Sequence, residues 1–259
     1  MSTGGYQVTL LPVGRSEIPG PELFWMSGWD TWYPLLFQVV LIQGGGITAL
    51  VNTGPPADLG PLNKHWAAVL GERSAMRREP GEFVTDQLAA HGVAPEDVTH
   101  VFLTPLQLYT VSNVTAFGSA QICLARRGWV HFHTTHQHPH DDRATSIPDD
   151  VLVHLVTGAW PRVRLLDDEE EVAPGLRTWW CGAHHRASIV VEADTPRGTA
   201  AISDAYFHLA NVESGHPIGI SENMYEAIAA YDRVRRTAQH IVPLYDPGNL
   251  SRFPGGRVA

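Results

Sequence analysis

The chain has 259 residues, of which 44% are hydrophobic and 17% charged, with a formal net charge of −9 at pH 7. This composition is typical of a globular protein, and no apolar run approaches the ~20 residues that a membrane-spanning helix needs. The negative charge argues against nucleic acid and acidic membrane surfaces as partners, because both need a positive surface. The first residues lack a basic start followed by an apolar stretch, so we expect a cytoplasmic protein.

Short runs of β-branched and aromatic residues, separated by Gly or Pro, dominate the chain and predict strands. Gly44 to Gly46 separate two of these runs and predict a hairpin turn. Cys123 and Cys181 lie inside such runs, so we expect both to be buried and unreactive. The predicted strands are 7–11, 36–42, 47–52, 98–103, 121–124, 177–180, 188–192 and 199–202.

Two segments have helical spacing. The first is Glu82 to Ala90. The second follows Ser221, a predicted N-cap, with Ala227 and Val234 beside one stripe. The members of that stripe are Met224, Ile228, Tyr231 and Arg235.

The segment 131–150 is polar and contains His131, His133, His136, His138 and His140, so we expect a loop or an insertion there. No other stretch has the composition of a long linker, and no repeat occurs. Mixed strands and helices in this order predict a single α/β domain over 1–259.

Five separated motifs occur in order along nearly the whole chain. Together they resemble the metallo-β-lactamase superfamily, in its N-acyl-homoserine lactonase-like branch. The resemblance implies a four-layer αβ/βα sandwich, in which two mixed sheets are flanked by helices. The motifs are Ala49-Leu-Val-Asn-Thr-Gly54, Pro95-Glu-Asp-Val-Thr-His-Val-Phe-Leu-Thr104, Gly182-Ala-His184-His-Arg-Ala-Ser188, Ile202-Ser-Asp204-Ala and His240-Ile-Val-Pro-Leu-Tyr245-Asp-Pro.

In the resembled family, seven side chains hold two metal ions, and only His184 and Asp204 match ligands here. Zinc sites favour imidazole, thiolate or carboxylate donors, usually four of them or three plus water. One His and one Asp are too few, so we predict a site with no metal and no cofactor. The remaining ligand positions are occupied by Pro105, Gln107, Tyr109, Thr110 and Tyr245.

Two ligands of one metal ion have donor atoms ~3.4 Å apart at a tetrahedral angle. Without a metal, His184 and Asp204 are therefore expected to form a hydrogen bond, which orients the imidazole as a general base. Tyr109 and Tyr245, at two vacated ligand positions, are expected to stabilise a developing oxyanion. We predict these four side chains as the catalytic residues.

The pocket around them is expected to bind a hydrophobic or aromatic small molecule. Trp25 belongs to an aromatic-rich N-terminal segment whose counterpart covers the active site in lactonase-like relatives. His185 and Arg186 are candidates for an anionic group. Lactonases of this branch place a tyrosine three residues after the bridging aspartate, whereas Phe207 stands there in this chain. The predicted substrate-binding residues are Trp25, Gln107, Thr110, His185, Arg186, Tyr206 and Phe207.

The leading functional hypothesis is a metal-independent enzyme that uses His184 and Asp204 for acid/base chemistry. Ester or lactone opening, cyclisation, dehydration and isomerisation all fit that machinery. The alternative is a catalytically silent ligand-binding or scaffold protein of the same fold. A zinc hydrolase that uses the His-rich segment is a third hypothesis, and a homodimer is compatible with each.

Overall fold

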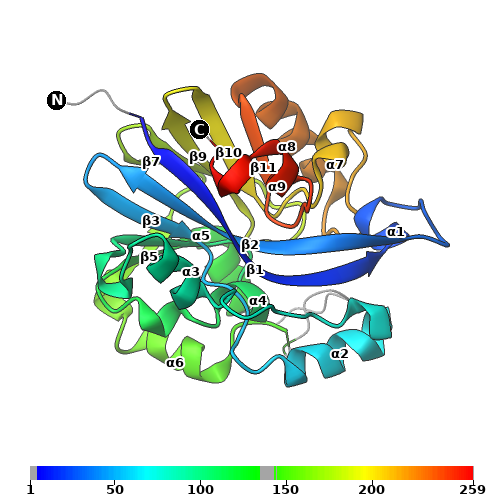
Figure 1. The fold of residues 1–259 in the computed structure, drawn as a ribbon, viewed down its shortest axis with the longest axis horizontal. Helices are drawn as coiled ribbons and strands as arrows, with labels where there is room; N and C mark the ends of the chain where they lie inside the picture. The colour runs from blue at the N-terminus through cyan, green and yellow to red at the C-terminus, as the bar shows by residue number, and fades with distance from the viewer. Residues whose placement is uncertain (1–4, 135–142, 144, 259) are drawn as a thin grey trace.

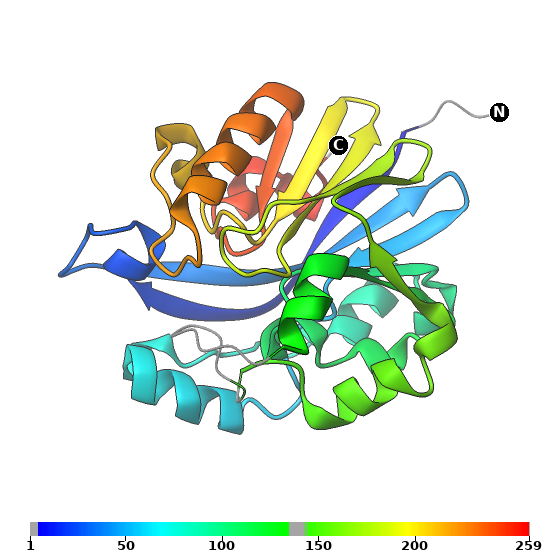
Figure 2. The ribbon, with the colours of Figure 1, turned by 180° about the vertical axis from the view of Figure 1, so that it is seen from behind.

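The computed structural model describes residues 5–134, 143 and 145–258. It contains a six-stranded sheet in the order β1-β2-β3-β4-β5-β6 and a five-stranded sheet in the order β11-β10-β9-β8-β7. The sheets lie against each other, and helices cover their outer faces (Figures 1 and 2). The predicted four-layer αβ/βα sandwich is therefore confirmed.

Both sheets are mixed. The pairs β1/β2 and β2/β3 are antiparallel, whereas β3 to β6 run parallel. In the second sheet only β10 and β11 are parallel. The strands are β1 (Gln7–Pro19), β2 (Trp32–Gly44), β3 (Ile47–Val51), β4 (His100–Leu103), β5 (Gln121–Ala125), β6 (Val163–Leu166), β7 (Glu169–Ala173), β8 (Leu176–Trp180), β9 (Ile189–Thr195), β10 (Gly198–Ser203) and β11 (His240–Pro243).

The α-helices before β6 lie between strands of the first sheet, and those after β10 either connect β10 to β11 or follow β11. They are α1 (Gly20–Leu23), α2 (Gly60–Leu70), α3 (Val84–Ala90), α4 (Leu108–Val111), α5 (Arg126–Phe132), α6 (Asp149–Val156), α7 (Leu209–Ser214), α8 (Met224–Thr237) and α9 (Asn249–Arg252). No helix in the described part of the chain is long and apolar enough to cross a bilayer.

Each predicted strand overlaps an observed one, and the predicted hairpin turn joins β2 to β3. Gly45 and Gly46 occupy this turn with φ of 57° and 81°, values that glycine adopts without steric cost. Both cysteines are buried, as expected. The edge strands β6, β7 and β11 were not predicted, because charged residues, His or Pro interrupt or flank their short apolar runs.

Two details of the helix predictions were wrong. The N-cap of α8 is Asn223, whose side-chain oxygen accepts the N–H groups of Tyr225 and Glu226, so Ser221 lies before the helix. Ile228 is 37% exposed, because the face that packs on the sheet is rotated away from the predicted stripe. That face consists of Ala227, Ala230, Tyr231 and Val234.

The segment predicted as a loop or an insertion, 131–150, is helical at its ends. His131 and Phe132 close α5, and Asp149 begins α6. His136, His138 and His140 lie outside the described residues. The prediction for the histidine cluster is therefore tested only at His131 and His133.

Alternation along β9 and β10 divides the core in two, because successive side chains of a strand point to opposite faces. Val191 and Ile202 face the first sheet within the larger hydrophobic cluster. Val190 and Ala201 face the other way and pack against α8. The second sheet is thus buried on both faces, and this packing holds the strand ends from which the loops leave.

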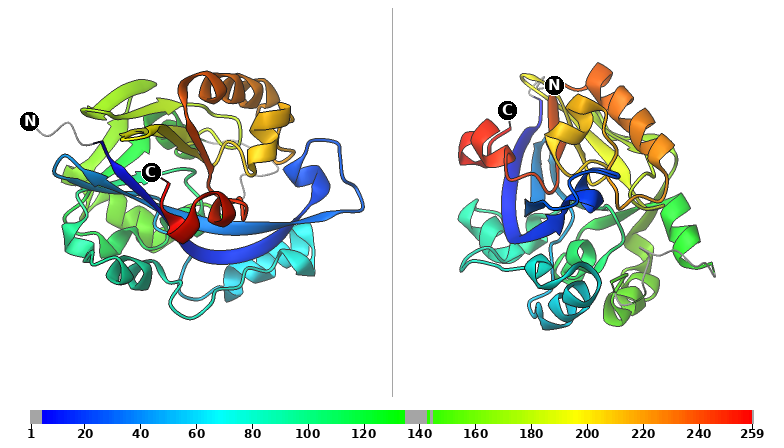
Figure 3. Two further views of the ribbon diagram at one scale, coloured as in Figure 1. Left: turned by 45° about the horizontal axis from the view of Figure 1, so that its top comes forward. Right: turned by 90° about the vertical axis from the view of Figure 1, so that its right-hand side faces the viewer.

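The far ends of β1 and β2 project beyond the other strands, with α1 where the two strands are connected (Figure 3). Ends of strands from both sheets lie beside the hairpin of β1 and β2. β10 and β11 are parallel and paired, so the residues that follow them, Asp204 and Tyr245, emerge at the same edge. The residues that follow β3 and β4 do the same in the first sheet.

Candidate active site

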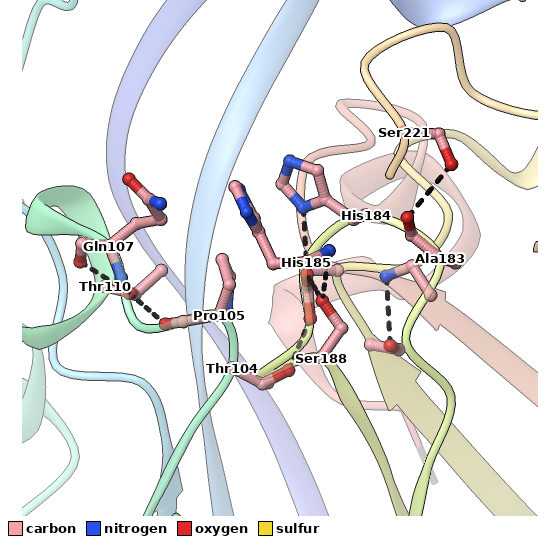
Figure 4. Close-up of polar contacts among 12 residues, drawn as sticks. Thr104, Pro105, Gln107, Thr110, Ala183, His184, His185, Ser188 and Ser221 are labelled. Carbon is pink, nitrogen blue, oxygen red and sulfur yellow. Dashed lines mark hydrogen bonds and ion pairs between the residues drawn. The ribbon is translucent and has the colours of Figure 1, made fainter. Parts of the chain in front are cut away.

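The predicted pair of His184 and Asp204 is present. His184 Nδ1 lies 2.9 Å from Asp204 Oδ2, and the two side chains are 2% and 0% exposed. Asp204 Oδ2 also accepts the Ser188 hydroxyl at 2.5 Å, and Oδ1 accepts the Thr104 hydroxyl. Figure 4 shows His184, Ser188 and Thr104 converging from the loops after β8 and β4. Asp204 therefore accepts hydrogen bonds from three side chains and fixes the orientation of the imidazole.

Burial lowers the pKa of His184 to about 4, the neighbouring His185 adds to this effect, and the contact with Asp204 opposes it. The ring is neutral at pH 7. Because Nδ1 faces a carboxylate, it carries the ring proton, and Nε2 keeps its lone pair. No residue in the described part of the chain hydrogen-bonds Nε2, and the ring lines a cavity. This arrangement suits a general base.

The backbone at Ala183 holds His184 in place. Ala183 has φ of 65°, in the left-handed region that costs a residue with a Cβ ~1 to 2 kcal/mol. Its carbonyl accepts the Ser221 hydroxyl at 3.0 Å (Figure 4) and the Glu222 N–H at 2.8 Å. Its N–H donates to Glu226 Oε2 at 3.0 Å. The segment that leads into α8 thus stabilises a conformation that Ala183 would otherwise avoid.

The cavity next to His184 has a volume of about 90 Å³. Its inner part is aromatic. Tyr245 packs 4.8 Å from Phe207 and 5.0 Å from Phe37, and Tyr109 packs 5.6 Å from Trp66, measured between ring centroids. Aliphatic side chains line the cavity as well, together with the polar Ser16, Glu17 and Ser74. The aliphatic residues are Ile18, Leu35, Leu70 and Ile220.

Tyr245 is 3% exposed, and its hydroxyl has no geometrically acceptable hydrogen-bond partner among the described residues. Burial raises the pKa of Tyr245 well above its ordinary value, and the neighbouring Tyr109 and Asp204 add to this effect. Burial likewise raises the pKa of Tyr109. Both phenols stay protonated at neutral pH, so each is a hydrogen-bond donor. An unsatisfied buried hydroxyl is costly and calls for an explanation.

Of the predicted substrate-binding residues, Gln107, His185 and Phe207 line the cavity with His184, Tyr109 and Tyr245. The others lie elsewhere. Thr110 is buried, and its hydroxyl donates to the carbonyls of Pro105 and Gln107 (Figure 4). The Tyr206 hydroxyl donates to the carbonyl of Ala201 in the core.

Trp25 and Arg186 also lie outside this cavity. Trp25 is 46% exposed, on the loop between α1 and β2. Arg186 pairs with Glu222 and Glu226 and lines a smaller neighbouring cavity, so its charge is already compensated. Sequence reasoning missed Phe37 and Trp66, which line the cavity, and Ser188, which binds Asp204. Ser188 was present in a quoted motif, and Phe37 belongs to the aromatic-rich N-terminal segment, whereas Trp66 gave no signal.

The residues at the family's metal positions do not fit two zinc ions. Pro105 has no donor atom, and the Thr110 hydroxyl is committed to backbone carbonyls. Tyr245 is a protonated phenol, whereas zinc favours imidazole, thiolate or carboxylate. Within the described residues no group of three or more His, Cys, Asp or Glu side chains is placed to hold a metal ion. Asn52, at the position of a family aspartate, instead bridges the N–H and C=O of Thr104 with its amide.

No protein-family model matches the chain, and no curated protein matches it. Many solved structures do. One is an N-acyl homoserine lactone hydrolase with its product N-hexanoyl-L-homoserine bound at the catalytic metal centre, with a TM-score of 0.79, 16% identity, and 96% of each chain covered. Another is a probable metal-dependent hydrolase from Staphylococcus aureus, with a TM-score of 0.74, 15% identity, and 95% and 91% of the two chains covered.

A third similar structure is AidC, a dizinc quorum-quenching lactonase, with a TM-score of 0.68, 13% identity, and 98% of this chain and 90% of that chain covered. A hydrolase of the β-lactamase superfamily also matches, with a TM-score of 0.66. At these identities the likeness establishes the fold and leaves the activity open. The chain therefore has the metallo-β-lactamase fold in its lactonase-like form, as its motifs indicated.

Proposed function

We propose that the protein is an enzyme that opens an ester or lactone by acid/base catalysis carried out by its own side chains. The observation that carries the proposal is a neutral His184, oriented by Asp204, in the same cavity as the unpartnered hydroxyl of Tyr245. The first group accepts a proton, and the second donates a hydrogen bond. Hydrolysis of an ester or lactone needs a base for the attacking water and a hydrogen-bond donor for the carbonyl oxygen, both close to the same carbonyl carbon.

In the proposed reaction His184 Nε2 takes a proton from water as the water oxygen attacks the carbonyl carbon. The carbonyl oxygen becomes an oxyanion and accepts hydrogen bonds from Tyr245 and Tyr109. A buried donor aimed at a developing charge is worth ~10²- to 10³-fold in rate. Asp204 holds the ring and stabilises the imidazolium that forms.

The size of the cavity favours a small reacting group. Its volume of about 90 Å³ is less than the ~150 Å³ of an engineered cavity that takes up benzene. The ester or lactone head would occupy the inner part, and an apolar chain would lie along Ile18 and Leu35. A polycyclic aromatic substrate would need the walls to move.

The test uses protein treated with a chelator and then assayed on a γ-lactone with an acyl chain and on a p-nitrophenyl ester. We expect activity in the wild type that added zinc does not raise and that His184→Gln lowers at least ~10²-fold. His91→Gln, which removes an exposed histidine, is the matched control. Activity that vanishes with the chelator and returns with zinc would contradict the proposal.

The competing function is a ligand-binding protein without catalysis. It is favoured by Asp204, because both of its carboxylate oxygens accept hydrogen bonds from Thr104, Ser188 and His184 without a ligand. Under this alternative both compounds hydrolyse at the uncatalysed background rate, whether the wild type or the His184→Gln variant is present.

A further inference from the structure

The loop that carries Tyr245 is fastened between the two sheets. Where it leaves β11, the N–H of Leu244 donates to the carbonyl of Ser203 at the end of β10 over 3.1 Å. On its other side the loop pairs with the part of β2 that precedes the pairing of β2 with β3. There the N–H of Leu36 donates to the carbonyl of Tyr245 at 2.9 Å, and the N–H of Gln38 donates to the carbonyl of Leu244 at 3.2 Å. The loop thus joins β2 of the first sheet to the strand ends of the second.

The side chain of Gln38 brackets Tyr245. Its Nε2 lies 3.4 Å from the carbonyl oxygen of Leu244 and 3.3 Å from that of Asp246, the residues before and after Tyr245. A third contact, at 3.2 Å, is the carbonyl oxygen of Leu36 on the same strand. Gln38 is 3% exposed and does not line the cavity. One carboxamide therefore holds the peptide groups on both sides of Tyr245 from outside the cavity.

The position of the Tyr245 hydroxyl depends on this fastening. The hydroxyl has no hydrogen-bond partner of acceptable geometry among the described residues, so the tip of the phenol is not held directly. The backbone and the packing of the ring set its place, and the ring lies 5.0 Å from Phe37 and 4.8 Å from Phe207 between centroids. Phe37 stands on β2 between Leu36 and Gln38, the two residues that bind the loop. A shift of the loop on β2 would therefore move the hydroxyl relative to a bound substrate.

We infer that Gln38 is a positioning residue for Tyr245, and that its carboxamide keeps the phenol where it can donate to the oxyanion. The inference rests on the proposed function, in which Tyr245 is that donor. A group that stabilises a transition state is effective only when the hydrogen bonds and packing around it hold its geometry. A misplacement of ~1 Å can lower a rate ~10²-fold. Gln38 therefore contributes to kcat through the Tyr245 hydroxyl, whereas its contribution to stability does not need that hydroxyl.

A double-mutant cycle separates these two contributions. Gln38→Met keeps the length of the side chain and removes its hydrogen bonds. We expect kcat for the p-nitrophenyl ester to fall ~10-fold or more, with KM little changed because the residue lies outside the cavity. In the Tyr245→Phe background the same substitution should not lower kcat further, because the hydroxyl that it misplaces is already absent. The melting temperature should fall by ~2 to 8 °C in both backgrounds.

Asn211→Ala is the matched control. This buried carboxamide donates to the carbonyls of Leu23 and His216, which do not line the cavity. The variant should lower the melting temperature as Gln38→Met does and leave kcat unchanged. If Gln38→Met does not fold, Asn249→Ala replaces it in the same cycle, because Asn249 Nδ2 donates to Gln38 Oε1 at 3.3 Å. Its effect on kcat should be weaker and should depend on the Tyr245 hydroxyl in the same way.

A loss of kcat that disappears in the Tyr245→Phe background, while the thermal effect remains, supports the inference. An equal loss of kcat in both backgrounds, or no loss in either, overturns the inference and leaves the proposed function standing. The same holds if Asn211→Ala lowers kcat as much as Gln38→Met. If Tyr245→Phe alone keeps the kcat of the wild type, or the wild type hydrolyses neither the ester nor a γ-lactone, the role proposed for Tyr245 fails and the inference fails with it.

Discussion

The backbone N–H of Ala183 donates to Glu226 Oε2 over 3.0 Å, which fixes the residue before His184 to the first turn of α8. The same carboxylate pairs with Arg186, so one side chain joins the loop that carries His184 to the helix at two points. The position of His184 thus depends on a residue outside the cavity.

The first prediction concerns this contact. Glu226→Ala leaves the Ala183 N–H without its acceptor, and we expect the free energy of unfolding to fall by ~2 kcal/mol. For a chain of this size the melting temperature should fall by ~4 to 8 °C. Calorimetry or thermal circular dichroism measures the change.

Glu169→Ala is the control, because Glu169 pairs with Arg233 at the surface and is 69% exposed. An exposed pair of this kind contributes ~0 to 1 kcal/mol. Equal melting temperatures for the two variants would show that Glu226 does not stabilise the Ala183 backbone.

The second prediction concerns pH. The pKa of His184 is about 4 in the folded chain against an ordinary value of 6.5. Between these values the unfolded chain binds a proton that the folded chain does not bind. The contribution of His184 to stability is therefore complete above pH 6.5 and declines as pH falls toward 4, by on the order of 3 kcal/mol.

Urea unfolding at several pH values between 7.5 and 4.5 measures this effect. Burial also lowers the pKa of His100 and His208, so the decisive quantity is the difference between the wild type and His184→Gln. The variant should lose less stability over this interval. Parallel curves for the two proteins would mean that His184 binds its proton equally in both states.

Sequence reasoning predicted the sheets and the histidine–carboxylate pair because both have local signals. Apolar runs mark the buried strands, and the motifs around His184 and Asp204 follow strand ends that a common edge brings together. The edge strands β6, β7 and β11 have only short, interrupted runs and were not predicted. The face of α8 was misplaced because small residues, Ala227 and Ala230, pack closest to the sheet, and alanine is a weak hydrophobic signal.

The contact between His185 and Glu222 could not be predicted, because Glu222 lies on the loop before α8 and meets His185 only in the folded chain. The sequence also could not show that Arg186 is already paired, because its carboxylate partners, Glu222 and Glu226, are distant in sequence. Phe37 on β2 and Trp66 on α2 form part of the wall of the cavity, whereas Trp25, which was predicted to do so, does not.

The third prediction follows from that wall. Trp25→Ala should leave kcat and KM of the ester reaction unchanged, because the side chain is exposed and outside the cavity. Trp66→Ala should raise KM, since Trp66 packs against Phe37 and Tyr109 and its removal enlarges the binding site. Steady-state kinetics with the p-nitrophenyl ester measures both. A rise in KM for Trp25→Ala alone would place the substrate on the N-terminal loop.

The fourth prediction separates stability from catalysis at Tyr245. Tyr245→Phe removes a buried hydroxyl that has no partner, so the variant should be as stable as the wild type or more stable by ~1 kcal/mol. In the proposed reaction the same change removes a donor to the oxyanion, so kcat should fall ~10²- to 10³-fold.

Tyr231→Phe is the matched control. Its hydroxyl donates to the carbonyl of Ala205 and accepts the N–H of Ile218, away from the cavity. That variant should lose ~1 to 2 kcal/mol of stability and keep its kcat. Unfolding and kinetic measurements on both variants give the answer: a stable Tyr245→Phe protein with wild-type kcat would exclude the hydroxyl from the reaction and leave it a filler of the cavity.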